Sequence, residues 1–361
     1  MRAIILVGGE GTRLRPLTYN VPKAVVPVLN EPFLKHVLYY LKEHGVDQVI
    51  LALGHQAEQI QSCLGGGSEL GLKLIYLIEH SPLGTAGAVK NAEAFLDEPF
   101  FVFNGDIFTD IDLTAMMHQH RERRASVSIA LVSVENPTIY GVVETDAGGR
   151  VKRFVEKPSW RQVTTNMINA GIYIVEPSVL KHIPPLTRFT FEHGLFPQLL
   201  ELGEPIFSYP SDAYWIDIGA PQKYLKLNCD LLLGKEHSIF YQPDVNNGVS
   251  FEGESFVHST AQTEGPLMIG ENCVIERDVQ LKGPAVLGMG CRLKQGAVVE
   301  RAVLWEDIEM GGSAVLKNCV IGSHSRIEEA VSLDDCVVGE NTIISKGSKL
   351  AYGLKAWSCG L

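Results

Sequence analysis

The 361-residue chain has no apolar run long enough to cross a membrane and no long basic run. A transmembrane helix needs about 20 consecutive apolar residues, whereas the first apolar run covers only residues 3–7. That run is also too short for a secretory signal peptide, so we expect a cytoplasmic protein. The formal net charge is −11. This charge makes nucleic acids and anionic membranes poor candidates as partners.

Cysteine is sparse, with seven residues and no Cys-x-x-Cys motif, which disfavours both a disulfide framework and a metal cluster. Two familiar phosphate loops are missing as well. The Walker pattern Gly-x-x-x-x-Gly-Lys-Ser/Thr does not occur. The dinucleotide pattern Gly-x-Gly-x-x-Gly starts at Gly9 and Gly11, but Leu14 occupies the place of its third glycine.

The most informative segment that is present covers residues 8–27 and reads GGEGTRLRPLTYNVPKAVVP. It follows the apolar run 3–7, which we predict to be a buried strand. A glycine-rich turn after such a strand lets backbone N–H groups approach phosphates closely. Arg13 and Lys23 add two cations. Together these groups suit a triphosphate better than a neutral ligand.

Residues 1–233 alternate short apolar runs with amphipathic patterns. This alternation predicts a mostly parallel, Rossmann-like sheet covered by helices on both faces. Ligands of such sheets bind at the carboxyl ends of the strands, where the glycine-rich turn and Asn104-Gly105-Asp106 both fall. The expected strands are 3–7, 49–53, 74–78 and 100–103, and the expected helices are 33–44 and 85–96. Residues 234–250 are polar and rich in turn formers, so we predict a linker there.

From residue 251 onward, aliphatic residues recur every six positions, a pattern typical of a parallel β-helix. Three strands make one coil of 18 residues, so Cys273 and Cys291 are expected to stack inside as small apolar side chains. The spacing predicts about five coils, and segments 303–314 and 353–361 depart from it. Exposed coil ends also favour a homo-oligomer. The recurring residues form three runs: Ile269, Ile275, Leu281, Leu287, Leu293 and Val299; Val315, Ile321, Ile327 and Leu333; and, after a one-residue slip, Val338, Ile344 and Leu350.

The string at 8–27 closely resembles the signature of the sugar-1-phosphate nucleotidyltransferases. The resemblance implies an α/β catalytic domain over residues 1–233 and a left-handed hexapeptide β-helix over 251–361. It also implies transfer of a nucleotidyl group from a nucleoside triphosphate to a sugar 1-phosphate, with release of pyrophosphate. The attacking phosphate and the triphosphate repel each other, so the resemblance further implies a divalent cation, Mg²⁺.

The resemblance assigns roles to residues in several separate segments. Arg13 and Lys23 would contact the phosphates of the transition state. Asp106, in Asn104-Gly105-Asp106, and Asp217, in Trp-Ile-Asp-Ile-Gly, would hold Mg²⁺. The nucleotide would be bound by Gly8, Gly9, Gly11, Thr12, Glu79, Gly84 and Thr85. The sugar phosphate would be bound by Gly141, Glu156, Lys157, Asn169 and Gly171.

The sequence defines the base of the nucleotide and the identity of the sugar less well than the class of reaction. The Glu79 carboxylate only accepts hydrogen bonds, and a guanine edge offers it two donors. The segment from Glu79 to Gly87 also resembles that of mannose-1-phosphate guanylyltransferases, so GTP and mannose 1-phosphate are favoured. Glucose-1-phosphate thymidylyl, uridylyl or adenylyl transfer stays open. So does a base choice made by backbone contacts alone.

Two other classes of protein remain open from the sequence. One is a catalytically silent subunit that senses a nucleotide sugar, although the retained charged motif residues argue against it. The other is a bifunctional enzyme whose β-helix is an acyltransferase with His258 or His324 as its base. A single histidine in a β-helix turn is more often a solvated surface residue, and a fold alone confers no activity.

Overall fold

The computed structural model describes residues 1–79, 81–235 and 248–357, so positions 236–247 of the predicted linker lie outside the described residues. The chain divides into two compact units. The first unit comprises Met1–Gly9 and Leu34–Trp215, and the second comprises Glu10–Phe33 and Ile216–Leu361. The signature segment after Gly9 therefore belongs to the same unit as the β-helix. No helix of the described ranges combines the length and the apolar character needed to cross a membrane.

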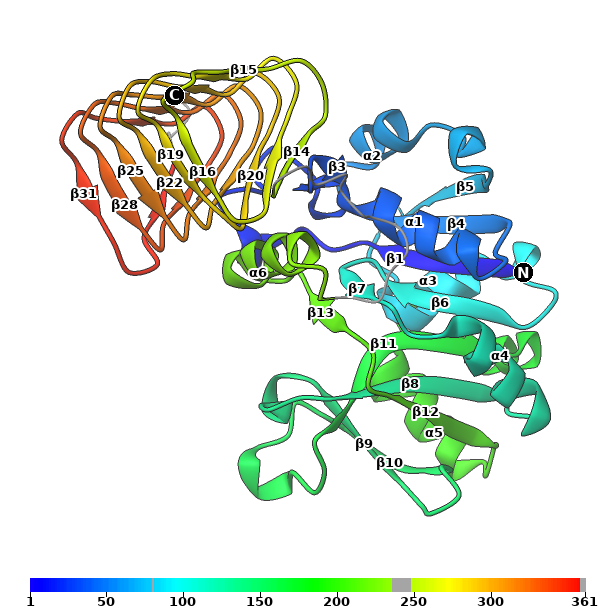
Figure 1. Cartoon of the computed structure of the whole chain (residues 1–361). Coiled ribbons are helices and arrows are strands. Elements are labelled where there is room, and N and C mark those ends of the chain that lie inside the picture. The colour runs from blue at the N-terminus through cyan, green and yellow to red at the C-terminus, as the bar shows by residue number, and fades with distance from the viewer. Residues whose placement is uncertain (80, 236–247, 358–361) are drawn as a thin grey trace. The chain divides into compact units, whose positions relative to one another are not determined.

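The first unit is built on a nine-stranded sheet (Figure 1). Its parallel half has the order β6-β1-β4-β5 and consists of the four predicted strands. These are β1 (Arg2–Val7), β4 (Gln48–Leu53), β5 (Lys73–Ile78) and β6 (Phe100–Asn104). The parallel arrangement brings the carboxyl ends of β1 and β6 to the same edge.

The other half of this sheet, which the sequence did not define, contains antiparallel pairs. Strand β11 runs antiparallel to β6, β8 and β9, whereas β12 runs parallel to β8. The strands are β8 (Val127–Ser133), β9 (Gly141–Thr145), β10 (Val151–Glu156), β11 (Met167–Val175) and β12 (Ile206–Ser211). Three of the predicted sugar-site segments lie on this half.

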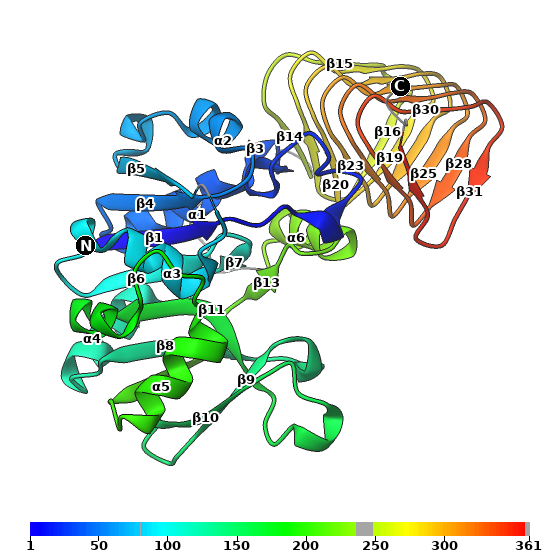
Figure 2. The same ribbon diagram turned by 180° about the vertical axis from the view of Figure 1, so that it is seen from behind.

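Helices cover both faces of the sheet, as the two opposite views show (Figures 1 and 2). Successive strand residues point to opposite faces. Phe100 and Val102 of β6 therefore join the cluster that includes α3 and α5, while Phe103 contacts Tyr40 of α1. The helices are α1 (Phe33–Glu43), α2 (Ala57–Leu64), α3 (Gly84–Asn91), α4 (Leu113–Glu122) and α5 (Phe196–Glu201).

The prediction of one helix over 85–96 is wrong in its second half. Helix α3 ends at Asn91, and a 3₁₀ turn over Glu93–Phe95 follows. Such tighter turns are common at helix ends, where the last carbonyls lack partners within the helix. Hydrophobic spacing alone does not distinguish the two.

The second unit contains a parallel β-helix of three sheets with seven, six and six strands (Figure 1). These form six complete coils and one further strand, one coil more than the spacing predicted. The hand of the coil stays a prediction. The first sheet contains β14 (Val249–Phe251), β17 (Leu267–Ile269), β20 (Ala285–Leu287), β23 (Val303–Leu304), β26 (Val320–Ile321), β29 (Val337–Val338) and β32 (Lys355–Ala356).

The two remaining sheets complete each coil in turn. The second holds β15 (Phe256–Val257), β18 (Val274–Ile275), β21 (Arg292–Leu293), β24 (Glu309–Met310), β27 (Arg326–Ile327) and β30 (Ile343–Ile344). The third holds β16 (Gln262–Glu264), β19 (Gln280–Lys282), β22 (Val298–Glu300), β25 (Val315–Lys317), β28 (Ser332–Asp334) and β31 (Lys349–Leu350).

The departure from the six-residue spacing at 303–314 does not interrupt the β-helix. The chain keeps coiling there with a step of 17 residues, pairing Val286 with Val303 and Val303 with Val320. One residue fewer at a corner explains the shift in spacing. Consequently Leu316 is fully buried, and Val315, which the six-residue count placed inside, is only half-buried.

Segment 353–361, which also departs from the spacing, continues the β-helix where the structure describes it, because Lys355 and Ala356 of β32 pair with β29. Residues 358–361 lie outside the described residues. The interior is apolar, and Cys273 and Cys291 are both buried in it as predicted. Cys319 and Cys336 are buried in later coils.

Segment 10–33 and helix α6 (Pro221–Leu232) pack in the second unit through specific polar contacts. The side chain of Asn228 accepts a hydrogen bond from the Leu29 amide at 2.9 Å. The Tyr224 hydroxyl donates to the Pro27 carbonyl and accepts from Trp305 Nε1 of the β-helix at 2.9 Å. Segment 10–33 itself forms 3₁₀ turns at Thr12–Leu14 and Lys23–Val25 and the short strands β2 (Pro27–Val28) and β3 (Glu31–Pro32).

Candidate functional site

Gly8 and Gly9 directly follow β1 in the first unit. The backbone is crowded on one side, since a Cβ at Gly54 would lie 3.0 Å from the Gly8 carbonyl oxygen. A Cβ at Gly105 would lie 2.6 Å from the Leu6 carbonyl oxygen. A Cβ at Gly8 or Gly9 would instead meet no described atom within 4 Å. These two glycines leave the space that a ligand held by backbone amides requires.

Gly11 starts the part of the signature that lies in the second unit. Its φ of +65° is left-handed, and a Cβ there would lie 3.1 Å from the Cβ of Lys23. Thr18 closes the turn by donating its hydroxyl hydrogen to the Gly11 carbonyl at 2.8 Å. The predicted pair of Gly11 and Lys23 is therefore brought together, and Thr12 beside them is exposed.

Arg13 and Asp217 meet at Gly219, also in the second unit. A Cβ at Gly219 would lie 2.7 Å from Arg13 Nη2 and 2.6 Å from Asp217 Oδ1. Asp217 ends β13 (Trp215–Asp217) and accepts a hydrogen bond from the Gly219 amide at 3.2 Å. Its second oxygen forms an ion pair with Lys223 of α6. One buried carboxylate thus lies beside two cations that suit an anionic substrate.

Lys223 was missed by sequence reasoning, because a lysine six residues after the aspartate belongs to no motif that we recognised. We expect Lys223→Met to lower the free energy of unfolding by about 1–2 kcal/mol, because the buried Asp217 loses one of its ionic partners and the lysine is partly exposed. Urea unfolding measures this. Lys226→Met is the control, because Asp230 keeps Lys235 at 2.8 Å. Equal losses in the two variants would contradict the role given to Lys223.

Asp106 lies in the turn after β6 and is half-buried. It belongs to the first unit, whereas Asp217 belongs to the second. Among the described residues no cluster of three or more His, Cys, Asp or Glu side chains is arranged for a metal. Mg²⁺ usually needs only one or two carboxylates beside substrate phosphates. A single carboxylate such as Asp106 is therefore a chemically suitable ligand for Mg²⁺ in company with substrate phosphates.

Glu79 follows β5 and is half-buried. Its backbone amide donates to the Leu53 carbonyl at 2.8 Å, and its carboxylate accepts from the Leu83 amide at 3.1 Å. Burial raises the pKa of the Glu79 carboxyl, and the Leu83 hydrogen bond partly offsets the rise. These contacts hold the carboxylate at the start of the segment that leads into α3.

Gly84 and Thr85 begin α3 and are held by the segment that follows residue 187. Gly84 has a φ of +73°, and a Cβ there would lie 2.7 Å from the Phe189 carbonyl oxygen. The Thr85 hydroxyl accepts from the Phe191 amide at 3.0 Å. It donates to Glu192 at 3.2 Å. Packing within the protein therefore accounts for the residue types at both positions.

Glu192 is a second residue that sequence reasoning missed. It lies in a π-helical turn over Phe191–Leu195, and burial, with a contribution from the Glu156 charge, raises its carboxyl pKa. Burial, Glu192 and Glu156 together raise the pKa of the fully buried Tyr173 hydroxyl well above its usual value. Thr85 of the nucleotide segment and Glu156 of the sugar segment are thus linked through Glu192. A glutamate in an amphipathic stretch gave no signal of this.

Glu156 ends β10, and Lys157 follows it with its side chain largely exposed. The Lys157 ammonium lies 3.7 Å from the Glu156 carboxylate, and its backbone amide donates to the Tyr140 carbonyl at 2.9 Å. A Cβ at Gly141 would lie 2.5 Å from Phe154 Cζ and 2.8 Å from Glu156 Oε2. Gly141 therefore makes room for these two side chains.

Asn169 and Gly171 lie on β11 at an irregularity in the pairing with β8. The Asn169 side chain accepts from the Gly171 amide at 2.9 Å and donates to the Tyr173 hydroxyl at 2.7 Å. Gly171 has a φ of +74°, and a Cβ there would lie 2.6 Å from Asn104 Nδ2. Contacts with Asn104 therefore require glycine at this position.

The predicted site residues thus form separate groups inside the two units. The first unit contains Gly8, Gly9, Glu79, Gly84, Thr85, Asp106, Gly141, Glu156, Lys157, Asn169 and Gly171, and the second contains Gly11, Thr12, Arg13, Lys23 and Asp217. Direct contacts join Arg13 to the Asp217 turn and Gly11 to Lys23. Charges and hydrogen bonds connect Thr85, Glu192 and Glu156.

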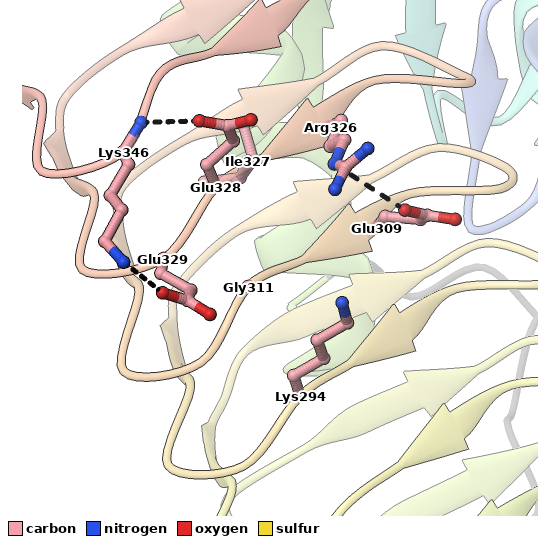
Figure 3. Close-up of a pocket in the computed structure, with 8 residues that line it drawn as sticks. All are labelled: Lys294, Glu309, Gly311, Arg326, Ile327, Glu328, Glu329 and Lys346. Carbon is pink, nitrogen blue, oxygen red and sulfur yellow. Dashed lines mark hydrogen bonds and ion pairs between the residues drawn. The ribbon is translucent and has the colours of Figure 1, made fainter.

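The outer face of the β-helix carries paired charges rather than a catalytic cluster. A hollow of about 190 Å³ lies there, lined by charged side chains that Figure 3 shows. In it Lys346 contacts Glu329 at 2.5 Å and Arg326 contacts Glu309 at 3.9 Å. Both candidate acyltransfer bases are surface residues engaged locally. His258 Nδ1 lies 3.0 Å from the Thr260 hydroxyl, and His324 Nδ1 lies 3.4 Å from the Asp307 carboxylate. Nothing in these contacts favours acyl transfer.

The family of the chain is shown by comparison with known proteins. Residues 2–233 match the family described as "Nucleotidyl transferase", and residues 252–352 match the "GMPPB C-terminal domain". The chain belongs to the nucleotidyl transferase family, and the prediction of a nucleotidyltransferase enzyme is confirmed.

The chain is similar to several characterised relatives over most of its length. The mannose-1-phosphate guanylyltransferase of Mycobacterium tuberculosis is 37% identical over 308 residues, covering 83% of each chain. A UTP–glucose-1-phosphate uridylyltransferase of Synechocystis is 32% identical over 354 residues, covering 92% of this chain and 90% of the relative. The solved structure of HddC from Yersinia pseudotuberculosis complexed with GMP-PN is 31% identical, with a TM-score of 0.55, over 63% of this chain and 97% of HddC.

Proposed function

We propose that this enzyme joins GTP and mannose 1-phosphate to give GDP-mannose and pyrophosphate. The observation that carries the reaction class is the cluster at Gly219, where Arg13 and Lys223 flank the Asp217 carboxylate. Cations fixed beside a carboxylate in this way suit a substrate rich in phosphate charge. The Mycobacterium tuberculosis relative supports the choice of GTP and mannose 1-phosphate.

Nucleotidyltransferases of this family generally use a divalent metal ion, and we propose Mg²⁺ held by Asp106 and Asp217. Bound there, Mg²⁺ would neutralise phosphate charge. The rest of the reaction needs positioning by the chain's own residues. Arg13 and Lys23 hold the triphosphate and favour departure of pyrophosphate. Lys157 neutralises the sugar phosphate, and Glu156 accepts hydrogen bonds from sugar hydroxyls.

The bond changes follow from the charges. An oxygen of the sugar 1-phosphate attacks the α-phosphorus and forms a new P–O bond. The bond from that phosphorus to the oxygen bridging the β-phosphorus breaks, and its electron pair leaves with pyrophosphate. The nucleophile is already anionic near neutral pH, so no side chain needs to remove a proton. Catalysis therefore rests on alignment and charge stabilisation.

A glucose-1-phosphate uridylyltransferase is the second candidate, favoured by the Synechocystis relative, which matches 92% of this chain. The test is pyrophosphate release with Mg²⁺, pairing GTP, UTP, dTTP and ATP with mannose and glucose 1-phosphate. We expect a strong preference for GTP with mannose 1-phosphate. Another preferred pair would keep the reaction and overturn the specificity. No release from any pair would favour a silent sensor subunit.

Glu79 is expected to read the base. Glu79→Gln should lower kcat/KM for GTP by about 10–100-fold, because the amide replaces one acceptor oxygen by an NH₂ donor that would face a guanine donor. Since burial raises the pKa of the Glu79 carboxyl, GTP use by the parent enzyme should also weaken as the pH falls through that raised value. The variant should lack this component of the pH profile. Glu69→Gln, an exposed matched change, is the control. Unchanged GTP preference in Glu79→Gln would assign base choice to the backbone.

We further propose domain boundaries, a cellular location and an oligomeric state. We propose residues 1–233 as the catalytic domain, 234–250 as the linker and 251–361 as the β-helix domain. We also propose a cytoplasmic enzyme and a homo-oligomer, for which sedimentation of the purified protein is the direct measurement. Sedimentation as a single chain at micromolar concentration would contradict the oligomer.

A further inference from the structure

The signature segment contacts the last coils of the β-helix within the second unit. Lys355 of β32 donates from Nζ to the Arg13 carbonyl at 3.4 Å. The Asn20 side chain donates to the Glu340 carboxylate at 3.3 Å. Arg13 and Asn20 are separated from these partners by more than three hundred positions in the sequence. The end of the β-helix therefore contacts the backbone of the residue that carries the phosphate-binding guanidinium.

The same segment also makes an aromatic contact with the end of the β-helix. The Tyr19 ring lies 5.9 Å from the ring of Trp357, measured between centroids. The Arg15 guanidinium carbon lies 5.4 Å from the Tyr19 centroid on this same segment. Pro16 packs close to Gly339, where an added Cβ would lie 3.0 Å from Pro16 Cβ. Aromatic and cation–π contacts of this kind favour one orientation of the rings.

The other end of the segment is anchored to earlier coils. Asn30 donates from its side chain to Glu252 at 2.7 Å and to the Leu287 carbonyl at 3.0 Å. The Leu29 amide donates to Asn228 of α6. Between these anchors the chain turns at Gly11 and brings Lys23 beside it. The part of the β-helix that holds Arg13 is therefore distinct from the part that holds Asn30.

We infer that Lys355, Trp357 and Glu340 are positioning residues, which hold the signature segment so that the Arg13 guanidinium stays beside Asp217. Arg13 is exposed, so core packing does not fix its side chain. Its backbone is instead held at the carbonyl by Lys355, while its guanidinium lies against Gly219. The inference rests on the proposed role of Arg13 in binding the triphosphate.

These contacts contribute little to the apolar core of the β-helix. Tyr19 is 44% exposed and Trp357 is 46% exposed. The interior of the coils is filled by other residues, among them Val338 and Ile344. Removing the contacts should therefore loosen the signature segment while the coils stay folded. A role in positioning is separable by experiment from a role in folding.

The experiment uses the full chain with Lys355→Met, Trp357→Ala and the two changes combined. We expect the combined variant to have a higher KM for the nucleoside triphosphate and a lower kcat. The value of kcat/KM for that substrate should fall about tenfold, because two partly exposed contacts are lost. KM for the sugar 1-phosphate should stay within twofold. Trp357→Phe, which keeps a ring, should restore most of the loss.

Matched controls separate this effect from general damage to the β-helix. Lys346→Met removes a lysine that pairs with Glu329 on the outer face, and Phe256→Ala removes an exposed ring from the first coil. Both should leave the kinetics unchanged. In an Arg13→Ala background, adding Lys355→Met should cause no further loss, because the positioned group is already missing.

A readout independent of activity is hydrogen exchange in peptides spanning residues 10–20. The combined variant should exchange faster there than the parent, with unchanged exchange in the coils around Leu293 and Val299. Faster exchange in a protein that releases no pyrophosphate would support the anchoring and reject the proposed function instead. If Trp357→Ala fails to fold, Lys355→Met and Asn20→Ala give the same comparison. Parental exchange and kinetics in the combined variant would overturn the inference, as would additive losses in the Arg13→Ala background.

Discussion

Replacing Arg13 or Asp106 with alanine is expected to lower pyrophosphate release by about 10²–10³-fold, because charge stabilisation supplies most of the proposed catalysis. Arg13 contributes a cation beside Asp217 and Gly219. Asp106 contributes one of the two proposed metal-binding carboxylates. The measurement is single-turnover pyrophosphate release at saturating substrate. Arg13→Ala should leave the thermal midpoint almost unchanged because the side chain is exposed.

Two matched substitutions test whether these losses are specific. Arg326→Ala removes an arginine whose nearest carboxylate is 3.9 Å away on the β-helix surface. Asp97→Ala removes an exposed aspartate that pairs with Arg2. Both should keep the parental rate. Near-parental turnover in purified, folded Asp106→Ala would remove that residue from the proposed mechanism and, with it, the two-aspartate metal site.

Gly84→Ala should give the largest loss of stability among simple changes at the predicted site residues. Gly84 has a φ of +73°, and an alanine Cβ would lie 2.7 Å from the Phe189 carbonyl oxygen. That carbonyl also accepts from the Ala86 and Gly87 amides, so it cannot move without weakening both hydrogen bonds. We expect a loss of about 3 kcal/mol, combining left-handed strain with the clash. Urea or thermal unfolding measures it.

Gly203→Ala separates the two contributions to that loss. Gly203 has a φ of +72°, and a Cβ there would meet no described atom within 4 Å. It therefore carries the conformational strain without a clash, and a loss of about 1 kcal/mol is expected. A similar loss in both variants would mean that the Phe189 carbonyl adapts freely. The interpretation of Gly84 as a packing residue would then fail.

Much of the fold could be predicted from hydrophobic spacing. The four parallel strands and α1 were found because continuous apolar runs and a helical period are strong local signals. The antiparallel half of the sheet was not found, since its pairing depends on contacts between distant segments. The β-helix was recognised from its six-residue period. The 17-residue coils were missed because one residue is lost at a corner, which shifts Leu316 into the place counted for Val315.

For the site, too, sequence motifs could be recognised, whereas the contacts that surround them could not be predicted. The signature, the two aspartates, Glu156 and Lys157 could be proposed as site residues because they lie in unusual strings. Their contacts could not, since Gly141 and Gly171 prove to be required by Phe154, Glu156 and Asn104. Lys223 and Glu192 were missed altogether. Each of these two residues acts through a partner that is close in space. Neither residue lies in a distinctive sequence motif.

The regular repeat of the β-helix also sets a length. Adjacent strands are about 4.8 Å apart, so each coil adds one such increment to the stack. Asn30 is anchored on early coils through Glu252 and Leu287, and Asn20 is anchored on the sixth coil through Glu340. Deleting a whole coil of 17 residues would preserve the apolar interior yet bring the two anchors one increment closer. The number of coils must therefore match the distance between the two anchored ends of the signature segment. A shortened enzyme would fold but hold that segment at only one end.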